Sequence, residues 1–364
     1  MSEDTYLAWL CLKTAPQLTP RACLSLLDIY PDPTLFVGKP EHPIYQQGIL
    51  KADAARHLKD FILPKNVEQI LQNMRHYQIR CLAYPDQDYP DKLREIFAPP
   101  LLLYVRGDLD SALRRKCLAV VGTRKATSYG REMCRRVLTP LCKDGLTVVS
   151  GLAMGIDTFA HHVALESSSL TIAVLASGVE NIYPPQNLEL ARRIVDQGAL
   201  VSEYEPGSKP ERWNFPARNR IISALSDAVF VVEGPITSGA LLTAKDAIEQ
   251  NRDVCALPGN INNLNAGGPN HLIKHGAALI SDAEDLYMLL NMKPESEKQL
   301  DIFPELCPDE ETLVSLLKEA QRALSFDELL IQSAFPIGRL STHLTNLELK
   351  GLIGKESGNS FFLC

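Results

Sequence analysis

The segment SGLAMGIDTFAHH, residues 150–162, brings together residue types that can do chemistry. It contains Ser150, Asp157, His161 and His162, the side chains of a nucleophile-and-base relay or of a metal site. If the segment is helical from residue 155 onward, Asp157 and His161 share one face, while His162 is rotated away. An aspartate in contact with a histidine orients the imidazole, as in a catalytic triad. The pattern therefore leaves two alternatives, a catalytic loop and a loop that only holds a ligand.

Two features of the segment favour the second alternative. Ser150 ends a strand-like apolar run and lacks the G-x-S-x-G turn that exposes a nucleophilic serine. A metal site needs a third ligand, and no H-E-x-x-H motif supplies one. We therefore predict that Asp157 braces the loop and that His161 gives it structural support. We expect no catalytic residue and no metal.

The elements that position this loop form a regular alternation between Lys116 and Asp282. Short apolar runs without period-two alternation are typical of strands that are buried on both faces. These runs span residues 117–122, 146–151, 171–177, 199–203, 228–234, 254–259 and 277–281. Helical segments lie between them, so the pattern predicts right-handed βαβ units and an α/β fold with a doubly wound parallel sheet. Ligands of such sheets bind at the carboxyl ends of the strands.

Smaller parts flank this core. Residues 79–85 and 99–107 predict two further strands that extend the sheet. The tail predicts helices near residues 310–321 and 325–333, a third helical segment, and a glycine-turned hairpin, which is the pattern of a winged helix. We therefore divide the chain into a helical domain (1–65), the core (66–293), a linker (294–308) and a winged-helix domain (309–364).

Composition limits the protein's location and partners. No apolar run approaches the roughly 20 residues that span a bilayer, and the N-terminus is acidic where a signal peptide is basic, so we expect a cytoplasmic protein without membrane contact. Nine cysteines without a CxxC pair argue against a disulfide framework or a zinc cluster. Residues 294–364 carry 12 acidic and 6 basic side chains, a net of −6, which leaves −1 of the total −7 for residues 1–293. Any polyanion must therefore bind to local basic patches.

Three loops that follow strands could hold phosphate groups. Gly122, Thr123 and Arg124 follow the first strand of the core, Gly151 and Gly155 follow the second, and Ser238 and Gly239 begin a helix after the fifth. Glycine allows close approach of the backbone, and a helix N-terminus favours anions. Tight turns in the fold are the alternative explanation, but three such loops favour binding. We expect no nucleotide cofactor, because neither GxGxxG with its acidic partner nor GxxxxGK[ST] occurs.

A second cluster mixes cations with aromatic rings. Arg212, Arg218 and Arg220 interleave with Trp213, Phe215 and Asn219. Guanidinium groups bind phosphate and rings stack on bases, which suits a flexible polyanion with exposed bases. Alternatively, the arginines pair with Glu203, Glu205 or Glu233. We expect a mixture, with at least one structural arginine.

With these motifs, the chain resembles the DNA-processing protein A family, also called Smf. The resemblance covers about 165 residues, from LAVVGTRKATSYG through VVSGLAMGIDTFAHHVAL, TIAVLASGVENIYPPQN, LVSEYEPG, FPARNRIISALSDAVFVVE and SGALLTAKDAIEQNRDVCALPG to GGPNHLIKHGAALI. It implies an extended Rossmann-like fold that binds single-stranded DNA without turnover. It also implies a homodimer that loads the RecA recombinase during natural transformation. No cofactor is implied.

The resemblance also assigns site residues. It implies that Arg124 of the G-[ST]-R loop, Arg212 and Phe215 set the DNA path. Backbone amides around Gly151 to Asp157 and Ser238 to Ala240 are implied to hold phosphates. The full expected DNA-binding set is Gly122, Thr123, Arg124, Gly151, Ala153, Gly155, Ile156, Asp157, Arg212, Phe215, Arg218, Asn219, Arg220, Ser238, Gly239 and Ala240, with His161 and Glu233 as structural support.

The chain departs from the family pattern at two places. Residues 15–38 correspond to a glycine-bearing helix-hairpin-helix but have no glycine in the first turn, so we expect a SAM-like packing or partner role for the N-terminal domain rather than DNA contact. Residues 238–240 read SGA where SGS is common, which removes one hydroxyl donor. The backbone N–H groups of this loop remain, so we still expect it to hold phosphate.

Two other functions compete with single-strand binding. A phosphoribohydrolase of the lysine-decarboxylase-like type needs a PGGxGTxxE loop, but this chain has GPITSGALLTAKDAIE at the comparable place. A duplex-binding regulator needs a basic recognition helix, and the tail offers only Arg339, His343 and Lys350 within an acidic domain. The sequence therefore favours single-stranded DNA as the ligand.

Overall fold

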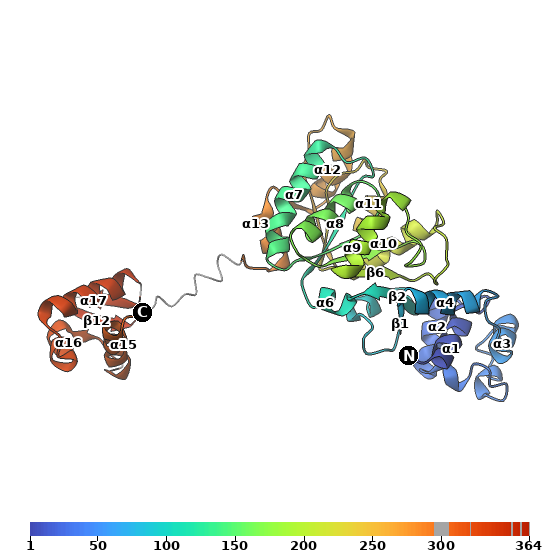
Figure 1. Cartoon of the computed structure of the whole chain (residues 1–364), viewed down its shortest axis with the longest axis horizontal. Helices are drawn as coiled ribbons and strands as arrows, with labels where there is room; N and C mark the ends of the chain where they lie inside the picture. The colour runs from blue at the N-terminus through green and yellow to red at the C-terminus, as the bar shows by residue number, and fades with distance from the viewer. Residues whose placement is uncertain (295–305, 321, 351, 357–358, 364) are drawn as a thin grey trace. The chain divides into compact units, whose positions relative to one another are not determined.

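The computed structural model describes residues 1–294, 306–320, 322–350, 352–356 and 359–363, and it divides into two compact units (Figure 1). Unit 1 comprises Met1–Pro294 and unit 2 comprises Glu295–Cys364. The helical segment expected at residues 1–65 packs within unit 1. Residues 295–305 of the expected linker lie outside the described residues.

The N-terminal segment is helical, as its composition predicts. Its elements are α1 (Glu3–Lys13), α2 (Pro20–Ile29), α3 (Ala52–Lys59) and α4 (Val67–His76). Ser2 and Thr19 cap the first two helices, because each hydroxyl accepts a hydrogen bond from a backbone N–H in the first turn. The hydroxyl groups of Tyr6 in α1 and Tyr104 lie 3.1 Å apart in the interior, which ties this segment to the sheet.

Unit 1 is built on one nine-stranded sheet with the order β1-β2-β6-β5-β4-β3-β7-β8-β9. The strands are β1 (Arg80–Ala83), β2 (Leu102–Gly107), β3 (Cys117–Val121), β4 (Thr147–Ser150), β5 (Thr171–Val174), β6 (Gly198–Ser202), β7 (Ala228–Val231), β8 (Asp253–Ala256) and β9 (Ala278–Leu279). The seven strands of the predicted core are parallel. The two predicted extra strands do extend the sheet, but β2 joins β6 in an antiparallel arrangement.

Helices cover both faces of this sheet, so the doubly wound α/β prediction is confirmed. Leu118 and Val120 of β3 pack in one cluster with α7 (Ser128–Lys143), α8 (Ile156–Glu166) and α13 (Ala283–Leu290). Ala119 and Val121 pack on the other side with α10 (Asn214–Ala224) and α11 (Gly239–Glu249). The remaining helices of the core are α5 (Asp91–Arg94), α6 (Leu109–Leu113), α9 (Leu188–Asp196) and α12 (Gly267–Lys274).

The strand order reverses between β3 and β7, which are neighbours although far apart in sequence. The chain leaves β3 toward β4 on one side and returns to β7 on the other. In open α/β sheets, the crevice at the carboxyl ends of the strands at such a switch point is the usual ligand site. The fold therefore predicts a site where the loops after β3 and β7 separate.

Unit 2 is the predicted winged helix. It contains α15 (Pro308–Ala320), α16 (Phe326–Ser333) and α17 (Ile337–Leu349). Its small sheet has the order β10 (Leu324–Ser325), β12 (Ser360–Leu363) and β11 (Ile353–Glu356), and β10 lies between α15 and α16 in the chain. Ser325 and Glu328 form a capping box at the start of α16. Leu313, Leu340 and Phe361 belong to its own apolar core. In the described part of the chain, no helix has both the length and the apolarity to cross a membrane.

Candidate functional site

A cavity of about 800 Å³ lies at the switch point, between the loops that follow β3 and β7. Its walls come from the loop 122–125, the start of α8, the first turns of α10 and the N-terminus of α11. Twelve of the sequence-predicted residues line it, namely Gly122, Thr123, Arg124, Ala153, Asp157, Arg212, Phe215, Arg218, Asn219, Ser238, Gly239 and Ala240. The fold therefore brings together segments that are more than one hundred residues apart in sequence.

The loop after β3 is held in shape by Glu233, a buried residue in the segment after β7. The Glu233 carboxylate accepts hydrogen bonds from the Thr127 amide (2.9 Å) and hydroxyl (2.5 Å). Its backbone carbonyl accepts one from the Thr123 amide (2.6 Å). These bonds fix both ends of the loop 123–127, so Arg124 and Lys125 project from a rigid turn and are themselves exposed.

Asp157 holds the loop after β4. Its Oδ2 accepts hydrogen bonds from the backbone amides of Gly151 (3.1 Å) and Ala153 (3.4 Å). Two N–H groups that the sequence suggested for phosphate are therefore used inside the protein. The Ile156 amide is also engaged, since it donates to the Thr123 carbonyl. This loop consequently reads as an internally braced wall of the cavity.

The positive charge behind this wall is Arg218, which is only 4% exposed. Its guanidinium donates hydrogen bonds to the carbonyl oxygens of Gly151 and Val174. Burial raises the pKa of Asp157 to about 6, against the opposing effect of Arg218, and burial lowers the pKa of Arg218 to about 10. Arg218 thus supports the wall from within.

The serine, aspartate and histidine of this segment do not form a relay. The Ser150 hydroxyl donates to the Val120 carbonyl over 2.6 Å. His161 Nδ1 lies 2.7 Å from the Thr171 hydroxyl, which itself donates to the Val148 carbonyl, so Nδ1 carries the proton and donates. Burial lowers the pKa of His161 to about 3, so the ring is neutral. The geometry matches a loop-bracing arrangement and offers no activated nucleophile in this segment.

The glycines differ in what surrounds them. A Cβ at Gly122 would lie 2.6 Å from Ile156, one at Gly151 would lie 2.5 Å from Arg218, and one at Gly155 would lie 2.2 Å from the Thr123 carbonyl. These three glycines allow close packing within the protein. A Cβ at Gly239 would meet nothing within 4 Å. Gly239 is thus the position of the four that leaves open space at the cavity.

The N-terminus of α11 faces the same cavity. Ser238 caps this helix, because its hydroxyl accepts a hydrogen bond from the Ala240 amide (3.2 Å). Ala240 also packs in the core, so the missing hydroxyl of the SGS pattern leaves a small buried side chain there. The helix dipole still favours an anion near Gly239.

Two family models match the chain. The model described as DNA recombination-mediator protein A matches residues 80–291, and the one described as DprA winged helix domain matches residues 301–359. Protein Smf of Escherichia coli (strain K12) is 36% identical, with 92% of each chain covered. The chain belongs to the DNA recombination-mediator protein A family.

A further relative and two solved structures are also similar to this chain. DNA processing protein DprA of Bacillus subtilis is 38% identical, with 70% of this chain and 86% of that protein covered. The structure of DNA processing protein A from Streptococcus pneumoniae is similar with a TM-score of 0.67 and 33% identity, covering 78% of this chain and 95% of that one. The structure of DNA processing protein A from Helicobacter pylori, described by its single-stranded DNA binding mode, has a TM-score of 0.54 and 30% identity. The match covers 60% of this chain and 99% of that one.

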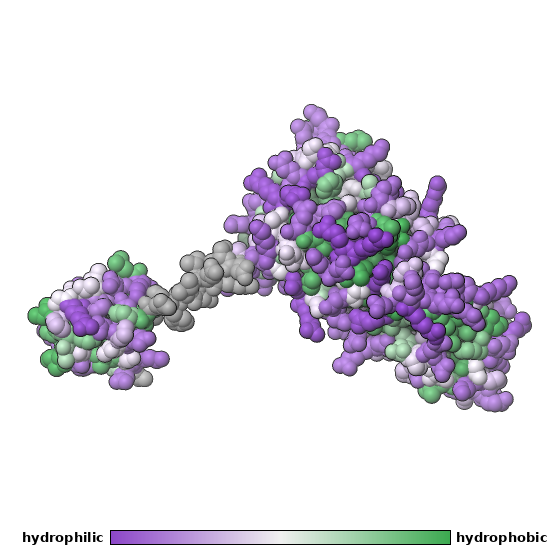
Figure 2. Space-filling model, viewed as in Figure 1, coloured by the Kyte–Doolittle hydropathy of each residue, from purple (hydrophilic) through white to green (hydrophobic). Residues whose placement is uncertain are grey.

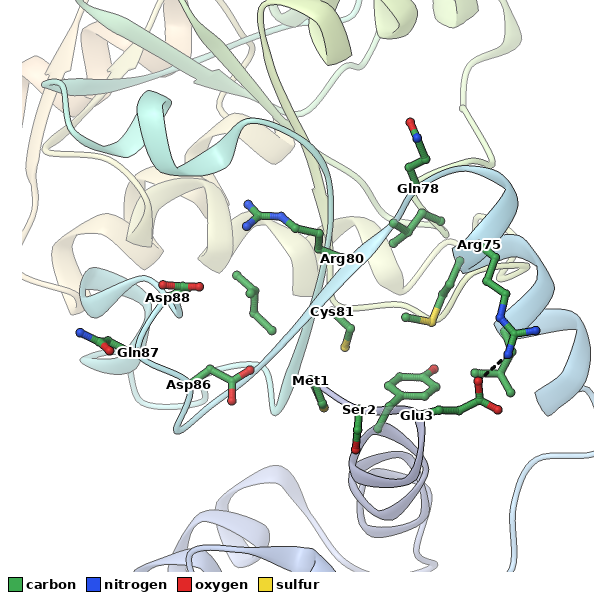
Figure 3. Close-up of a pocket in the computed structure, with 15 residues that line it drawn as sticks. Met1, Ser2, Glu3, Arg75, Gln78, Arg80, Cys81, Asp86, Gln87 and Asp88 are labelled. Atoms are coloured by element: carbon green, nitrogen blue, oxygen red, sulfur yellow. Dashed lines mark hydrogen bonds and ion pairs between the residues drawn. The ribbon is translucent and has the colours of Figure 1, made fainter.

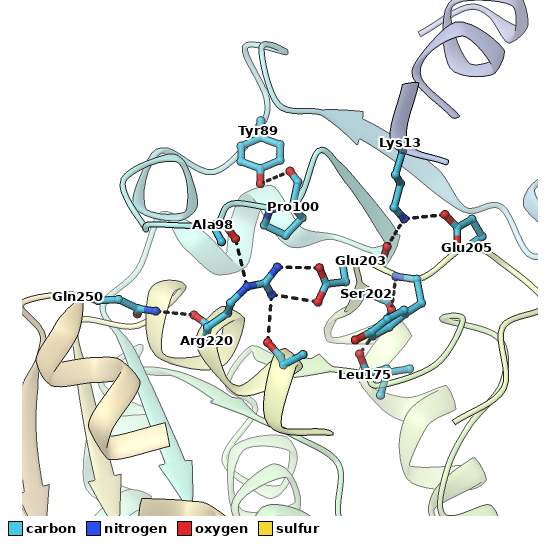
Figure 4. A network of polar contacts seen from close by, with 12 residues as sticks. Lys13, Tyr89, Ala98, Pro100, Leu175, Ser202, Glu203, Glu205, Arg220 and Gln250 are labelled. Carbon is cyan, nitrogen blue, oxygen red and sulfur yellow. Dashed lines mark hydrogen bonds and ion pairs between the residues drawn. The ribbon is translucent and has the colours of Figure 1, made fainter. Parts of the chain in front are cut away.

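Arg220, another residue suggested by the family motif, lies outside the cavity lining. Its guanidinium makes two hydrogen bonds with Glu203 (3.0 and 2.7 Å), and its Nε donates to the Ala98 carbonyl (Figure 4). Lys13 of α1 donates to the Glu203 carbonyl and pairs with Glu205 at 2.7 Å. The network therefore joins α10, the loop after β6 and helix α1. Arg220 is thus a structural arginine, and at least one structural arginine was expected in this cluster.

The cavity residues that sequence reasoning missed include Lys125 and Tyr183. Lys125 follows Arg124 directly, so the basic pair was visible in the sequence. Tyr183 comes from the segment between β5 and α9, and no local pattern links it to Phe215. The two rings nevertheless meet at a centroid distance of 5.7 Å.

A second cavity of about 720 Å³ lies at the sheet edge, beside β1 and the N-terminus of α1 (Figure 3). Arg80 and Cys81 of β1 line it, and Glu3 at its mouth pairs with Arg75 at 2.5 Å. None of the residues predicted by the family motifs lines this cavity. On the face shown in Figure 2, hydrophobic side chains gather near the positions of α8, α10 and α11 in Figure 1 and also over the N-terminal helices α1 and α2.

Three basic side chains of the winged helix contact carboxylates within unit 2. Arg339 contacts Asp309 at 2.5 Å, and His343 Nε2 lies 3.1 Å from the same carboxylate. Lys350 contacts Glu310 at 2.6 Å. The three basic side chains that the sequence offered for duplex binding therefore face the acidic start of α15.

Proposed function

We propose that this protein binds single-stranded DNA in the switch-point cavity, protects it, and loads it with the RecA recombinase. The observation that carries the proposal is the position of Arg124. It is exposed at the cavity on a loop fixed by Glu233, and no carboxylate of the described residues forms an ion pair with it. A guanidinium on a fixed loop without a carboxylate partner is ready to contact a phosphate.

The remaining cavity chemistry supports the same ligand. Lys125 and Arg212 add exposed cations, and the open N-terminus of α11 at Gly239 favours an anion. Arg218, Arg220, His161 and Glu233 support these elements from within, and in this proposal they do not contact DNA. The single-stranded DNA binding named for the Helicobacter pylori relative is consistent with this assignment.

A gel-shift experiment over a salt series tests the proposal. We expect preference for single-stranded over duplex oligonucleotides and a steep loss of affinity with salt, because phosphate contacts release counterions. Arg124→Ala should remove most of the affinity with the fold intact, whereas Arg136→Ala, an exposed charge on α7, should not. Equal affinity for both DNA forms would contradict the proposal, as would loss of binding on deletion of residues 295–364.

We propose further that the protein has two protein partners, a second copy of itself and RecA, and that it does not catalyse a reaction on the bound DNA. The protein acts in the cytoplasm as a homodimer, it brings RecA onto the bound strand, and it needs no cofactor. Light scattering tests the dimer, and a RecA filament-assembly assay with and without Arg124→Ala tests the loading. Release of free base from nucleoside monophosphates would instead support the phosphoribohydrolase alternative.

A further inference from the structure

A thiol, an imidazole and a carboxylate meet in unit 2, where the start of α15 contacts α17. They belong to Cys307, His343 and Asp309, each of them half-buried, and one ligand atom from each lies within 4.8 Å of the other two. Cys307 Sγ is 3.7 Å from His343 Nδ1, and Asp309 Oδ2 is 3.1 Å from His343 Nε2. In the described part of the chain, these three side chains form the one group of histidine, cysteine and acidic residues that is close enough to share a metal ion.

Cys307 stands at a helix position where a thiol is unusual. It directly precedes α15, and its carbonyl accepts a hydrogen bond from the Glu311 amide (3.0 Å), which is the bond that an N-cap residue makes. Serine, threonine, aspartate and asparagine are preferred at this position, because their side-chain oxygen accepts a hydrogen bond from the first turn. The thiol lies instead against the His343 ring. Capping therefore does not explain the cysteine, whereas a role as a metal ligand does.

The spacing of α17 directs His343 toward these groups. Arg339 and His343 are four residues apart and share one face of the helix, and both contact Asp309. The Oε1 atom of the buried Glu310 lies 3.9 Å from His343 Nδ1, the same nitrogen that is 3.7 Å from Cys307 Sγ. Tetrahedral zinc, with bonds of about 2.0–2.3 Å, holds neighbouring ligand atoms about 3.3–3.7 Å apart. The observed separations need only small side-chain rotations to reach these values.

The nearby cations do not use up the carboxylates. Arg339 contacts Asp309 at Oδ2 from both Nε (2.7 Å) and Nη2 (2.5 Å). Lys350 contacts Glu310 at Oε2 (2.6 Å), which also accepts a hydrogen bond from the Cys307 amide (3.1 Å). In both carboxylates these contacts fall on one oxygen, which leaves the second oxygen available as a ligand. The two cations balance the two carboxylates, so the net charge that a divalent ion meets is that of the thiolate.

We propose that unit 2 binds a zinc-like divalent ion between α15 and α17, with Cys307, His343 and Asp309 as its ligands and Glu310 beside the fourth position. Binding releases the thiol proton to solvent. Thiolate and imidazole select zinc-like ions over Mg²⁺ and Ca²⁺, which prefer oxygen ligands. Sequence spacing predicted no metal, because Cys307 and His343 are 36 residues apart and only the fold brings them together. The bound ion joins the start of α15 to α17 and so stabilises the winged helix.

Cobalt(II) is the probe for this site, because it occupies zinc sites and gives an intense near-ultraviolet band when a thiolate binds it. The full-length chain is titrated with Co²⁺ under reducing conditions. We expect the thiolate band to saturate at a single ion per chain, to disappear when Zn²⁺ is added and to persist in excess Mg²⁺. The band also separates this site from the neighbouring exposed rings of His271 and His275, which bring no sulfur.

Three variants identify the ligands. Cys307→Ser should abolish the band and weaken Zn²⁺ binding roughly 100-fold or more, since the loss of an outer-shell partner alone costs about 10- to 100-fold. It places a favoured capping residue before α15, so the unfolding temperature without metal should not fall. His343→Gln should weaken Zn²⁺ binding as well. Cys81→Ser is the matched control and should keep the band, because Cys81 is the other half-buried cysteine of the described residues.

The inference is overturned if the wild type shows no thiolate band at stoichiometric Co²⁺, if Cys307→Ser keeps the band, or if His343→Gln binds Zn²⁺ as the wild type does. The test is independent of the proposed single-strand site, whose cavity belongs to unit 1. Arg124→Ala should therefore bind Co²⁺ as the wild type does, and Cys307→Ser should bind single-stranded DNA as the wild type does.

Discussion

The guanidinium of Arg218 occupies the space in which a side chain at residue 151 would lie. Its Nη1 donates a hydrogen bond to the Gly151 carbonyl over 2.8 Å, while the Gly151 amide donates to Asp157 over 3.1 Å. Gly151 is therefore held from two helices, because Arg218 of α10 bonds its carbonyl and Asp157 of α8 bonds its amide. This joint sets the shape of the cavity wall that faces Arg124.

Removing the Arg218 side chain should therefore lower the free energy of unfolding of the protein. Arg218→Ala removes the guanidinium hydrogen bonds to the buried Gly151 and Val174 carbonyls, and each lost hydrogen bond of a charged donor costs about 1.5–3 kcal/mol. Urea unfolding measures the loss. Arg212→Ala is the matched control, because Arg212 is exposed on the same segment and its loss should change stability by less than about 0.5 kcal/mol. A stable Arg218→Ala variant that only loses DNA affinity would make Arg218 a DNA contact.

The two kinds of glycine should respond oppositely to alanine. Gly122→Ala forces a methyl against Ile156 and the Glu233 carbonyl, and such overpacking costs about 1–3 kcal/mol. Gly239→Ala meets open space and begins a helix, so it should keep or slightly raise the unfolding temperature. If the DNA backbone approaches this position, the same methyl should weaken single-strand binding. Unchanged affinity of Gly239→Ala would remove α11 from the DNA path.

Asp157 should make stability depend on pH with a definite sign. Burial raises the pKa of Asp157 from 3.8 to about 6 in the folded chain. Between these values the unfolded chain has released a proton that the folded chain retains, so the contribution of Asp157 to stability falls as pH rises from about 4 to about 6. The free energy of unfolding of the wild type, taken relative to that of Asp157→Asn at the same pH, should fall by roughly 3 kcal/mol over this range and change little above it. Urea unfolding of both proteins at four pH values tests this. The prediction is contradicted if the wild type becomes more stable relative to Asp157→Asn as the pH rises.

Much of the fold could be predicted because strands that are buried on both faces appear in the sequence as continuous apolar runs. The runs at 117–122 and 228–234 lack polar alternation, and they became β3 and β7 of the sheet centre. The place of β2 beside β6 could not be read in this way, because strand order depends on contacts between distant segments. The antiparallel direction of β2 was missed for the same reason.

The site shows the same division between local and long-range information. Arg218 and Arg212 are identical in type, and the difference in their burial follows from helical phase, since Arg218 is three and four residues before the buried Ile221 and Ile222. That signal was present in the sequence. The contact between Tyr183 and Phe215 has no such signal, because 32 residues and a strand separate them.

The acidic start of α15 should keep the winged helix from binding duplex DNA. Asp309 neutralises Arg339 and contacts His343, so Asp309→Asn should free a cation on α17. In full-length chain that carries Arg124→Ala to silence the core, we expect this change to raise duplex affinity and to steepen its salt dependence by about one phosphate contact. Glu319→Gln removes the same charge from an exposed position on α15 and serves as the control. If both variants gain equally in the gel shift, bulk charge and not the Asp309 pairing limits duplex binding, and if neither gains, α17 is not a DNA-reading helix at all.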